Sequence, residues 1–135
     1  MATATPERVL LSEYRHRPDR YAEVVSAGRW KRYDHLKYIG LRIARAVNAG
    51  NGRLIINMPP RLGKSELISH WTPTWFLDDD PSKRIILASY GSELAVNYGR
   101  LVRNEAATNP RVRNLRLTED SKAAGKWNTP HGGGM

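Results

Sequence analysis

The tripeptide Gly63-Lys64-Ser65 constrains the fold of this chain most, because it lies between two different hydrophobic patterns. A short apolar run rich in β-branched residues, at positions 54–58, precedes it and predicts a buried strand. Apolar residues at helical spacing follow it over positions 67–77 and predict a helix, which Pro73 is expected to kink or break. The sequence therefore predicts a strand, a loop and a helix in immediate succession.

A loop in this position is suited to bind phosphate. Backbone N–H groups at a helix N-terminus lack intrahelical partners and carry partial positive charge. Lys64 would reach the β- and γ-phosphates, Ser65 would place its hydroxyl on a bridging Mg²⁺, and Gly63 permits close approach of the backbone. The pattern is that of a Walker A loop, although Met58 stands where the full pattern has its first glycine.

Hydrophobic spacing along the rest of the chain predicts an α/β fold. A helix is expected over residues 34–49, and another from Ser92 to the stop at Asn109-Pro110. Residues 84–89 predict a second buried strand, and residues 126–129 a further short one. Strand, loop, helix, strand and helix in this order imply parallel strands joined by a right-handed crossover.

Walker A chemistry also needs an acidic site at the end of a later apolar strand, to hold Mg²⁺ and orient the attacking water. The run that ends in Asp78-Asp79-Asp80 does not fit, because it continues the helix after the loop and leads into a turn at Pro81. Glu119-Asp120 follows no apolar strand either. The metal-binding Asp and the catalytic Glu of such a site are therefore expected to be missing from this sequence.

The chain is strongly basic, with 22 Lys and Arg against 13 Asp and Glu and a net charge of +9. Such an excess makes a polyanion, either nucleic acid or nucleotide phosphate, the first partner to consider. Eight arginines could contact DNA phosphates, an acidic neighbouring subunit or water, and the sequence leaves these alternatives open. They are Arg15, Arg17, Arg20, Arg100, Arg103, Arg111, Arg113 and Arg116.

Other residue types exclude other chemistry. The chain has no cysteine, which rules out a disulfide framework, a thiolate zinc site and a cysteine nucleophile. Its four histidines are scattered, so metal ligation by them is not expected. Trp71, Trp75 and Phe76 fit core packing better than stacking on bases. No apolar run approaches the roughly 18 residues of a membrane span, so a soluble protein is expected.

The segment Pro59-Pro60-Arg61-Leu62-Gly63-Lys64-Ser65 resembles the deviant Walker A loop of the large terminase subunit of tailed bacteriophages. The likeness continues through residues 75–77 and 84–91 and into the helix that follows, and it covers roughly residues 33–135. Trp127, Thr129 and the glycines after them resemble the segment just ahead of the family's Walker B strand.

The resemblance implies part of a RecA-like P-loop NTPase domain with a parallel sheet. This domain would span residues 33–135 and end before the Walker B strand, after a helical, basic arm at residues 1–32. The implied cofactors are ATP and Mg²⁺, with Tyr33 and its neighbours to position 39 in the region of the adenine. The phosphates would be bound by Pro60, Arg61, Leu62, Gly63, Lys64 and Ser65. Lys64 would be catalytic, Arg61 would sense the γ-phosphate, and Ser65 would ligate Mg²⁺.

The family couples ATP hydrolysis to translocation of double-stranded DNA into the procapsid. The partners implied are double-stranded DNA, the portal protein, the small terminase subunit and further copies in a homo-oligomeric ring, with no membrane. The implied location is the cytoplasm of the bacterial host, at the procapsid portal. The chain alone is expected to be weakly active or inactive as an ATPase. Two alternatives stay open: a nucleic-acid-binding module without ATPase activity, and a truncated helicase-like P-loop NTPase.

Overall fold

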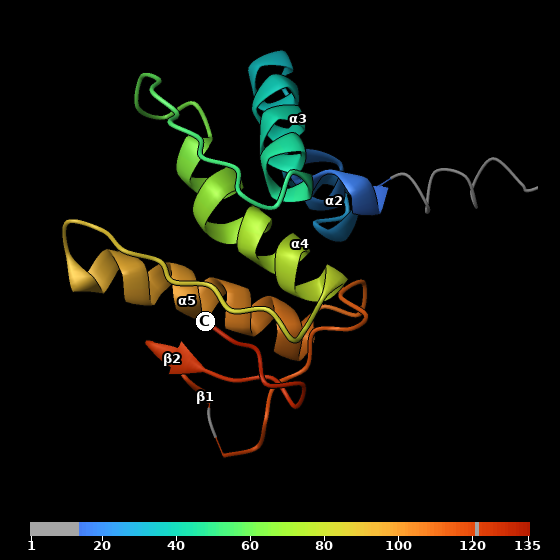
Figure 1. Cartoon of the computed structure of the whole chain (residues 1–135), viewed down its shortest axis with the longest axis vertical. Helices are drawn as coiled ribbons and strands as arrows, with labels where there is room; N and C mark the ends of the chain where they lie inside the picture. Colours follow the sequence, from blue (N-terminus) through green and yellow to red (C-terminus); the bar gives the residue numbers. More distant parts are fainter. Residues whose placement is uncertain (1–13, 121) are drawn as a thin grey trace, which may run out of the picture. The chain divides into compact units, whose positions relative to one another are not determined.

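The computed structural model describes residues 14–120 and 122–135 (Figure 1). The chain forms two compact units, Met1–Leu67 and Ile68–Met135. The first unit holds η1 (Tyr14–His16), α2 (Pro18–Val25) and α3 (Asp34–Asn48). The π-helix η2 (Glu66–Trp71) crosses the division. The second unit holds α4 (Thr72–Asp79), α5 (Ser92–Thr108), β1 (Lys122–Ala123) and β2 (Lys126–Trp127).

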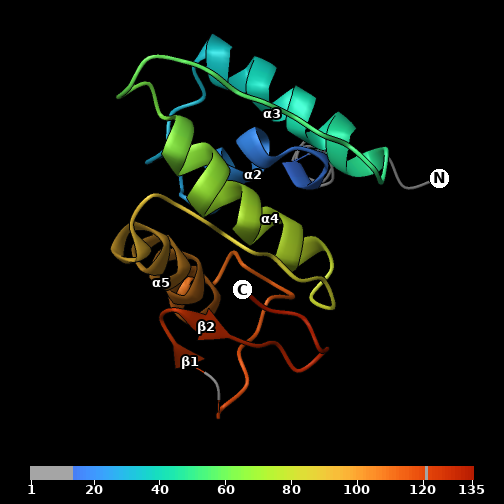
Figure 2. The ribbon, with the colours of Figure 1, turned by 60° about the vertical axis from the view of Figure 1, so that its left-hand side comes forward.

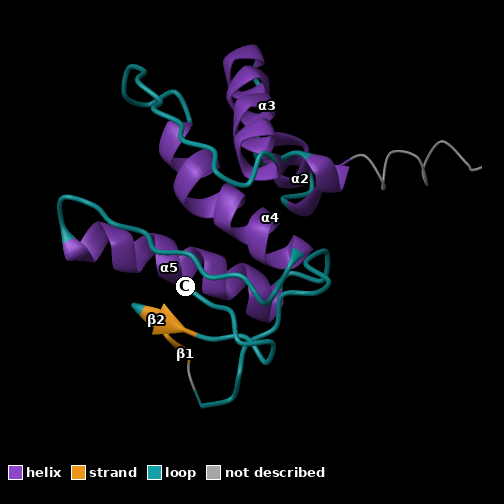
Figure 3. Cartoon of the chain, in the orientation of Figure 1, coloured by secondary structure: helices purple, strands orange, loops and turns teal. Residues whose placement is uncertain are grey.

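The predicted α/β fold with a RecA-like parallel sheet is wrong. Helix accounts for 49% of the structure and strand for only 5% (Figure 3). Among the described residues, the only sheet consists of the two short strands β1 and β2. They pair antiparallel, with Lys122 opposite Trp127 and Ala123 opposite Lys126. The strand expected at residues 126–129 is thus formed over its first two positions.

The two runs that were predicted as buried strands are extended but join no sheet within the described residues. Ile55 in the first run is 87% exposed, and Ile86 in the second is 95% exposed. β-Branched residues favour an extended backbone locally, but a strand also needs a neighbour that takes up its N–H and C=O groups. The local pattern therefore did not predict that these runs would be exposed and unpaired.

The prediction of a helix at residues 34–49 is confirmed by α3, which ends one residue earlier. α2 packs against α3, as Figure 2 shows. The buried face of α3 includes Leu36, Gly40 and Ile43. α2 begins with Pro18, whose missing N–H costs nothing in the first turn of a helix.

A buried acidic residue, Asp19, links these two helices. Its carboxylate is fully buried and accepts hydrogen bonds from Arg17 Nε at 3.0 Å and from Arg32 Nε at 2.8 Å. Arg17 also donates to the Lys37 carbonyl at 2.6 Å, which ties the start of α2 to α3. A Cβ atom on Gly40 would overlap Asp19 Oδ1, so this position requires glycine. Arg17 is thus engaged within the protein.

The helix after the loop continues through Pro73, which had been expected to kink or break it. η2 changes into α4 immediately before this residue, and Pro73 occupies the first turn of α4. Proline lacks the N–H that an α-helix interior requires, and a change of helix type moves the hydrogen-bond pattern past it. The helix therefore extends to Asp79 in two geometries.

The core of the second unit forms between α4, α5 and the segments that follow α5. The two helices pack against each other, and Trp71, Trp75 and Trp127 are buried. The prediction that Trp71 and Trp75 pack in the core is therefore confirmed. The indole Nε1 of Trp127 donates to the Gly99 carbonyl of α5 at 3.1 Å, which satisfies its polar atom inside the core.

Asp78 fixes a loop to the end of α4. It is only 3% exposed, and its Oδ1 accepts hydrogen bonds from three consecutive amides: Arg113 at 3.0 Å, Asn114 at 2.7 Å and Leu115 at 3.0 Å. Asn114 Nδ2 also donates to the Asp78 carbonyl at 2.9 Å. Asp78 thus has a structural role.

The last residues of the chain connect β2 to the second extended run. The amide and carbonyl of Met135 both bond to Trp127, each at 3.0 Å. Gly134 pairs with Arg84 in a parallel bridge, and its carbonyl accepts from Ile85 N at 3.0 Å. No helix in the described part of the chain combines the length and apolar character needed to cross a bilayer.

Candidate phosphate-binding loop

The loop of residues 60–65 leads from an extended segment into a helix, as the sequence predicts. Pro60 and Arg61 form a turn, and Lys64 and Ser65 are already helical. Gly63 and Lys64 are half-buried, whereas Arg61 and Ser65 are exposed. The loop backbone is therefore accessible to a ligand, with the start of a helix at its end.

Two residues of the loop have left-handed backbone conformations. Arg61 has φ 63° and Gly63 has φ 83°, with Leu62 between them. Glycine adopts such angles freely, but a left-handed arginine is uncommon. Left-handed residues in a turn can bring successive N–H groups to one side, and such concave arrangements bind anions.

The loop is held against the N-terminal turn of α3. His35 Nε2 lies 2.9 Å from the Leu62 carbonyl oxygen. A Cβ atom on Gly63 would lie 3.2 Å from Leu36 Cδ1 of α3, so any larger residue at this position would be crowded by Leu36. At the other end, Leu67 N donates to the Gly63 carbonyl at 3.0 Å and closes the first turn of the helix.

The polar side chains of the loop are open to a ligand. In the part of the chain that the structure describes, the side chains of Arg61, Lys64 and Ser65 form no hydrogen bond or ion pair with other residues. Lys64 contributes an ammonium group, Arg61 a guanidinium group and Ser65 a hydroxyl. These are the groups that contact phosphate oxygens and a phosphate-bound Mg²⁺.

A cavity of about 480 Å³ adjoins the loop between α3 and the first extended run. Tyr38, Ile39 and Arg42 line it from α3, and Leu62 lines it from the loop. The rings of Tyr33 and His35 lie parallel, with centroids 6.1 Å apart. Part of the region predicted to lie near adenine therefore lines a cavity next to the loop, which the sequence alone did not indicate.

The remaining candidate residues lie outside the loop. Of the arginines predicted as phosphate contacts, Arg103 is half-buried and four others on or after α5 are exposed: Arg100, Arg111, Arg113 and Arg116. His70 is buried, stacks on Trp71 and lies 3.3 Å from Glu105 Oε1. No group of three or more possible metal ligands occurs among the described His, Asp and Glu side chains.

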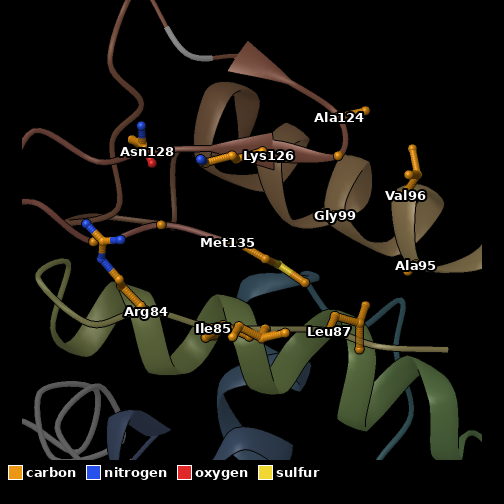
Figure 4. Close-up of a pocket in the computed structure, with 14 residues that line it drawn as sticks. Arg84, Ile85, Leu87, Ala95, Val96, Gly99, Ala124, Lys126, Asn128 and Met135 are labelled. Atoms are coloured by element: carbon orange, nitrogen blue, oxygen red, sulfur yellow. The ribbon is translucent and has the colours of Figure 1, made fainter. Parts of the chain in front are cut away.

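The second unit has its own cavity, of about 370 Å³ (Figure 4). The extended run contributes Ile85 and Leu87, α5 contributes Ala95 and Val96, and Met135 also lines it. Its ionisable lining residues, Arg84 and Lys126, are both cationic. The lining is otherwise apolar or backbone, apart from Asn128.

Two carboxyl groups outside the loop have lowered pKa values. A hydrogen bond from Lys37 Nζ, 2.9 Å from Asp34 Oδ1, and the charge of that ammonium lower the pKa of Asp34. The hydroxyl and the amide of Ser82 both donate to Asp80 and lower its pKa. These contacts lie in the first turn of α3 and in the turn after α4, and neither involves the loop.

Three polar contacts described above were not foreseen from the sequence: those of Asp19, Asp78 and His35. Each joins segments that are separated along the chain, and no local motif marks the residue.

No protein-family model, curated protein or solved structure matches the chain.

Proposed function

We propose that residues 60–65 bind the phosphates of ATP together with Mg²⁺, as the nucleotide-binding part of a DNA-packaging ATPase of the large-terminase type. The observation that carries the proposal is the loop itself. Its backbone has left-handed φ values at Arg61 and Gly63, and the side chains of Lys64 and Ser65 are available at the start of a helix.

The direction of the backbone supports this proposal. The Gly63 carbonyl accepts from Leu67 N at 3.0 Å and therefore points along the helix. In a trans peptide the following N–H points the opposite way, so the Lys64 amide is directed out of the helix end. The amides of the first turn add partial positive charge in the same direction, and the Lys64 ammonium adds a full one.

Each polar side chain of the loop contacts a different part of the Mg²⁺–triphosphate group. Lys64 offsets charge on the β- and γ-phosphates, and the Ser65 hydroxyl donates an oxygen ligand to Mg²⁺. Arg61 is exposed and can reach a γ-phosphate oxygen. The neighbouring cavity accepts the base. Hydrolysis needs an additional acidic group to orient water, so binding without efficient turnover is the expected activity of the chain alone.

Titration with a fluorescent ATP analogue in Mg²⁺ tests this function. The unmodified protein is expected to bind saturably, and Lys64→Ala is expected to weaken binding by about 10- to 100-fold, since a charge-assisted hydrogen bond contributes roughly 1.5–3 kcal/mol. Lys31→Ala is the matched control, because it removes the same charge from an exposed position. Equal losses in the two variants would mean that net charge, not the loop, binds the nucleotide.

A second candidate function is binding of nucleic acid without nucleotide. It is favoured by the exposed arginines of the second unit, among them Arg111 and Arg113. Such contacts would make affinity for duplex DNA fall steeply with salt. The same protein samples distinguish the two candidates: salt-dependent DNA binding without any affinity for the ATP analogue supports this second function and contradicts the first.

A further inference from the structure

We propose that His35 is a positioning residue for the phosphate loop, which holds the Leu62 carbonyl so that the Gly63 amide faces the bound anion. The inference rests on the proposed function, because it assigns a role within the same site. It starts from the hydrogen bond between the two segments, in which His35 Nε2 lies 2.9 Å from the Leu62 oxygen. A carbonyl oxygen only accepts, so Nε2 carries the proton in this contact.

Because the peptide group is planar, the direction of the Leu62 carbonyl also fixes the direction of the Gly63 N–H. All described peptide bonds are trans, and in a trans peptide the C=O and the following N–H point in opposite directions. Because the Leu62 carbonyl points at His35 on α3, the Gly63 N–H points away from α3. The Lys64 N–H also points outward, since the Gly63 carbonyl bonds to Leu67 N at 3.0 Å. Two consecutive amides thereby point away from the segments that hold the loop.

The loop requires an outside contact to keep this arrangement. Arg61 holds a left-handed conformation that is unfavourable for a residue with a side chain, and Gly63 could adopt many others. Leu36 limits Gly63 from one side, with Cδ1 3.2 Å from where a Cβ would stand. His35 supplies the directional part, because it bonds the peptide group between these two residues.

The surroundings of His35 fit a positioning role. Its ring lies parallel to that of Tyr33, with an angle of 4° between the planes, which restrains the direction of Nε2. His35 is exposed, so its removal leaves no buried polar group without a partner. It also lines the cavity beside the loop. A ligand that fills this cavity would therefore contact the residue that orients the loop.

The test compares His35→Gln with His35→Met, which have side chains of similar length but differ in the presence of an N–H donor. Affinity for the fluorescent ATP analogue in Mg²⁺ is expected to fall roughly 3- to 10-fold in His35→Met, the loss of one hydrogen bond. His35→Gln is expected to stay within about twofold of the unmodified protein, because its amide can donate to the same carbonyl. Both variants are expected to keep the unmodified melting temperature.

The outcomes separate this inference from the function it rests on. If the unmodified protein binds and Lys64→Ala does not, but His35→Met binds normally, the positioning role is wrong while the nucleotide site stands. Equal losses in His35→Gln and His35→Met, or a lower melting temperature in both, would also overturn the role, since only donation should matter. If the unmodified protein shows no saturable binding, both the site and the role are wrong.

Discussion

Asp78→Ala is expected to lower the free energy of unfolding by about 3–5 kcal/mol, because three consecutive backbone amides lose the charged acceptor that the buried Asp78 provides. The affected amides belong to Arg113, Asn114 and Leu115, so the segment that leads away from α5 loses its attachment to α4. Urea denaturation followed by tryptophan fluorescence measures the change, since Trp71 and Trp75 are buried in the same unit.

Asp79→Ala is the matched control for this substitution. It removes the same group at the neighbouring position, which is exposed, and is expected to change stability by less than about 0.5 kcal/mol. Asp78→Asn should fall between the two, because an amide oxygen still accepts hydrogen bonds but carries no charge. A similar stability for Asp78→Ala and Asp79→Ala would show that the three amides do not depend on this carboxylate.

Asp19→Ala is expected to cost about 3–5 kcal/mol in the first unit, the usual loss when one partner of a buried ion pair is removed. Arg17 and Arg32 would keep their positive charges in a largely buried position without Asp19, and Arg32 would retain only its longer contact with Glu23 Oε2, at 3.7 Å. The contact between α2 and α3 would loosen as a result. Thermal unfolding followed by far-ultraviolet circular dichroism measures this loss, because α2 and α3 provide most of the helix of this unit.

Asp34→Ala is the control for Asp19→Ala, because it removes a carboxylate from a solvent-exposed salt bridge instead of a buried one. Asp34 pairs with Lys37 at 2.9 Å, but its side chain is 97% exposed, so solvent screens the pair. Its removal should leave the melting temperature unchanged. If Asp19→Ala behaved in the same way, the buried arginines would not need Asp19.

The helices could be predicted from the sequence because their signals are local. Apolar residues recur at helical spacing in α3 and α5, and both helices end within a few residues of the expected stop. The parallel sheet could not be predicted in the same way. A run such as that around Ile55 favours an extended backbone, but its pairing depends on another segment, which the run itself does not encode. The helices were thus predictable from local pattern, whereas the strands and their pairing were not.

The candidate site was also predictable only in part. The triplet beginning at Gly63 marks the loop, because those residue types serve one chemistry at one spacing. The left-handed conformation of Arg61 has no such marker, and neither does the contact from His35, which is 27 positions from Leu62. Such contacts depend on how distant segments of the chain pack together. Only the three-dimensional structure shows them.

The close approach of α3 to Asp19 has an evolutionary consequence. A side chain at Gly40 would overlap the carboxylate, so Gly40 can be replaced only after position 19 has become smaller. Replacement of Asp19 in turn removes the reason for glycine in the middle of a helix, where it is otherwise unfavourable. Natural variants of this chain should therefore change Gly40 only where position 19 has also changed.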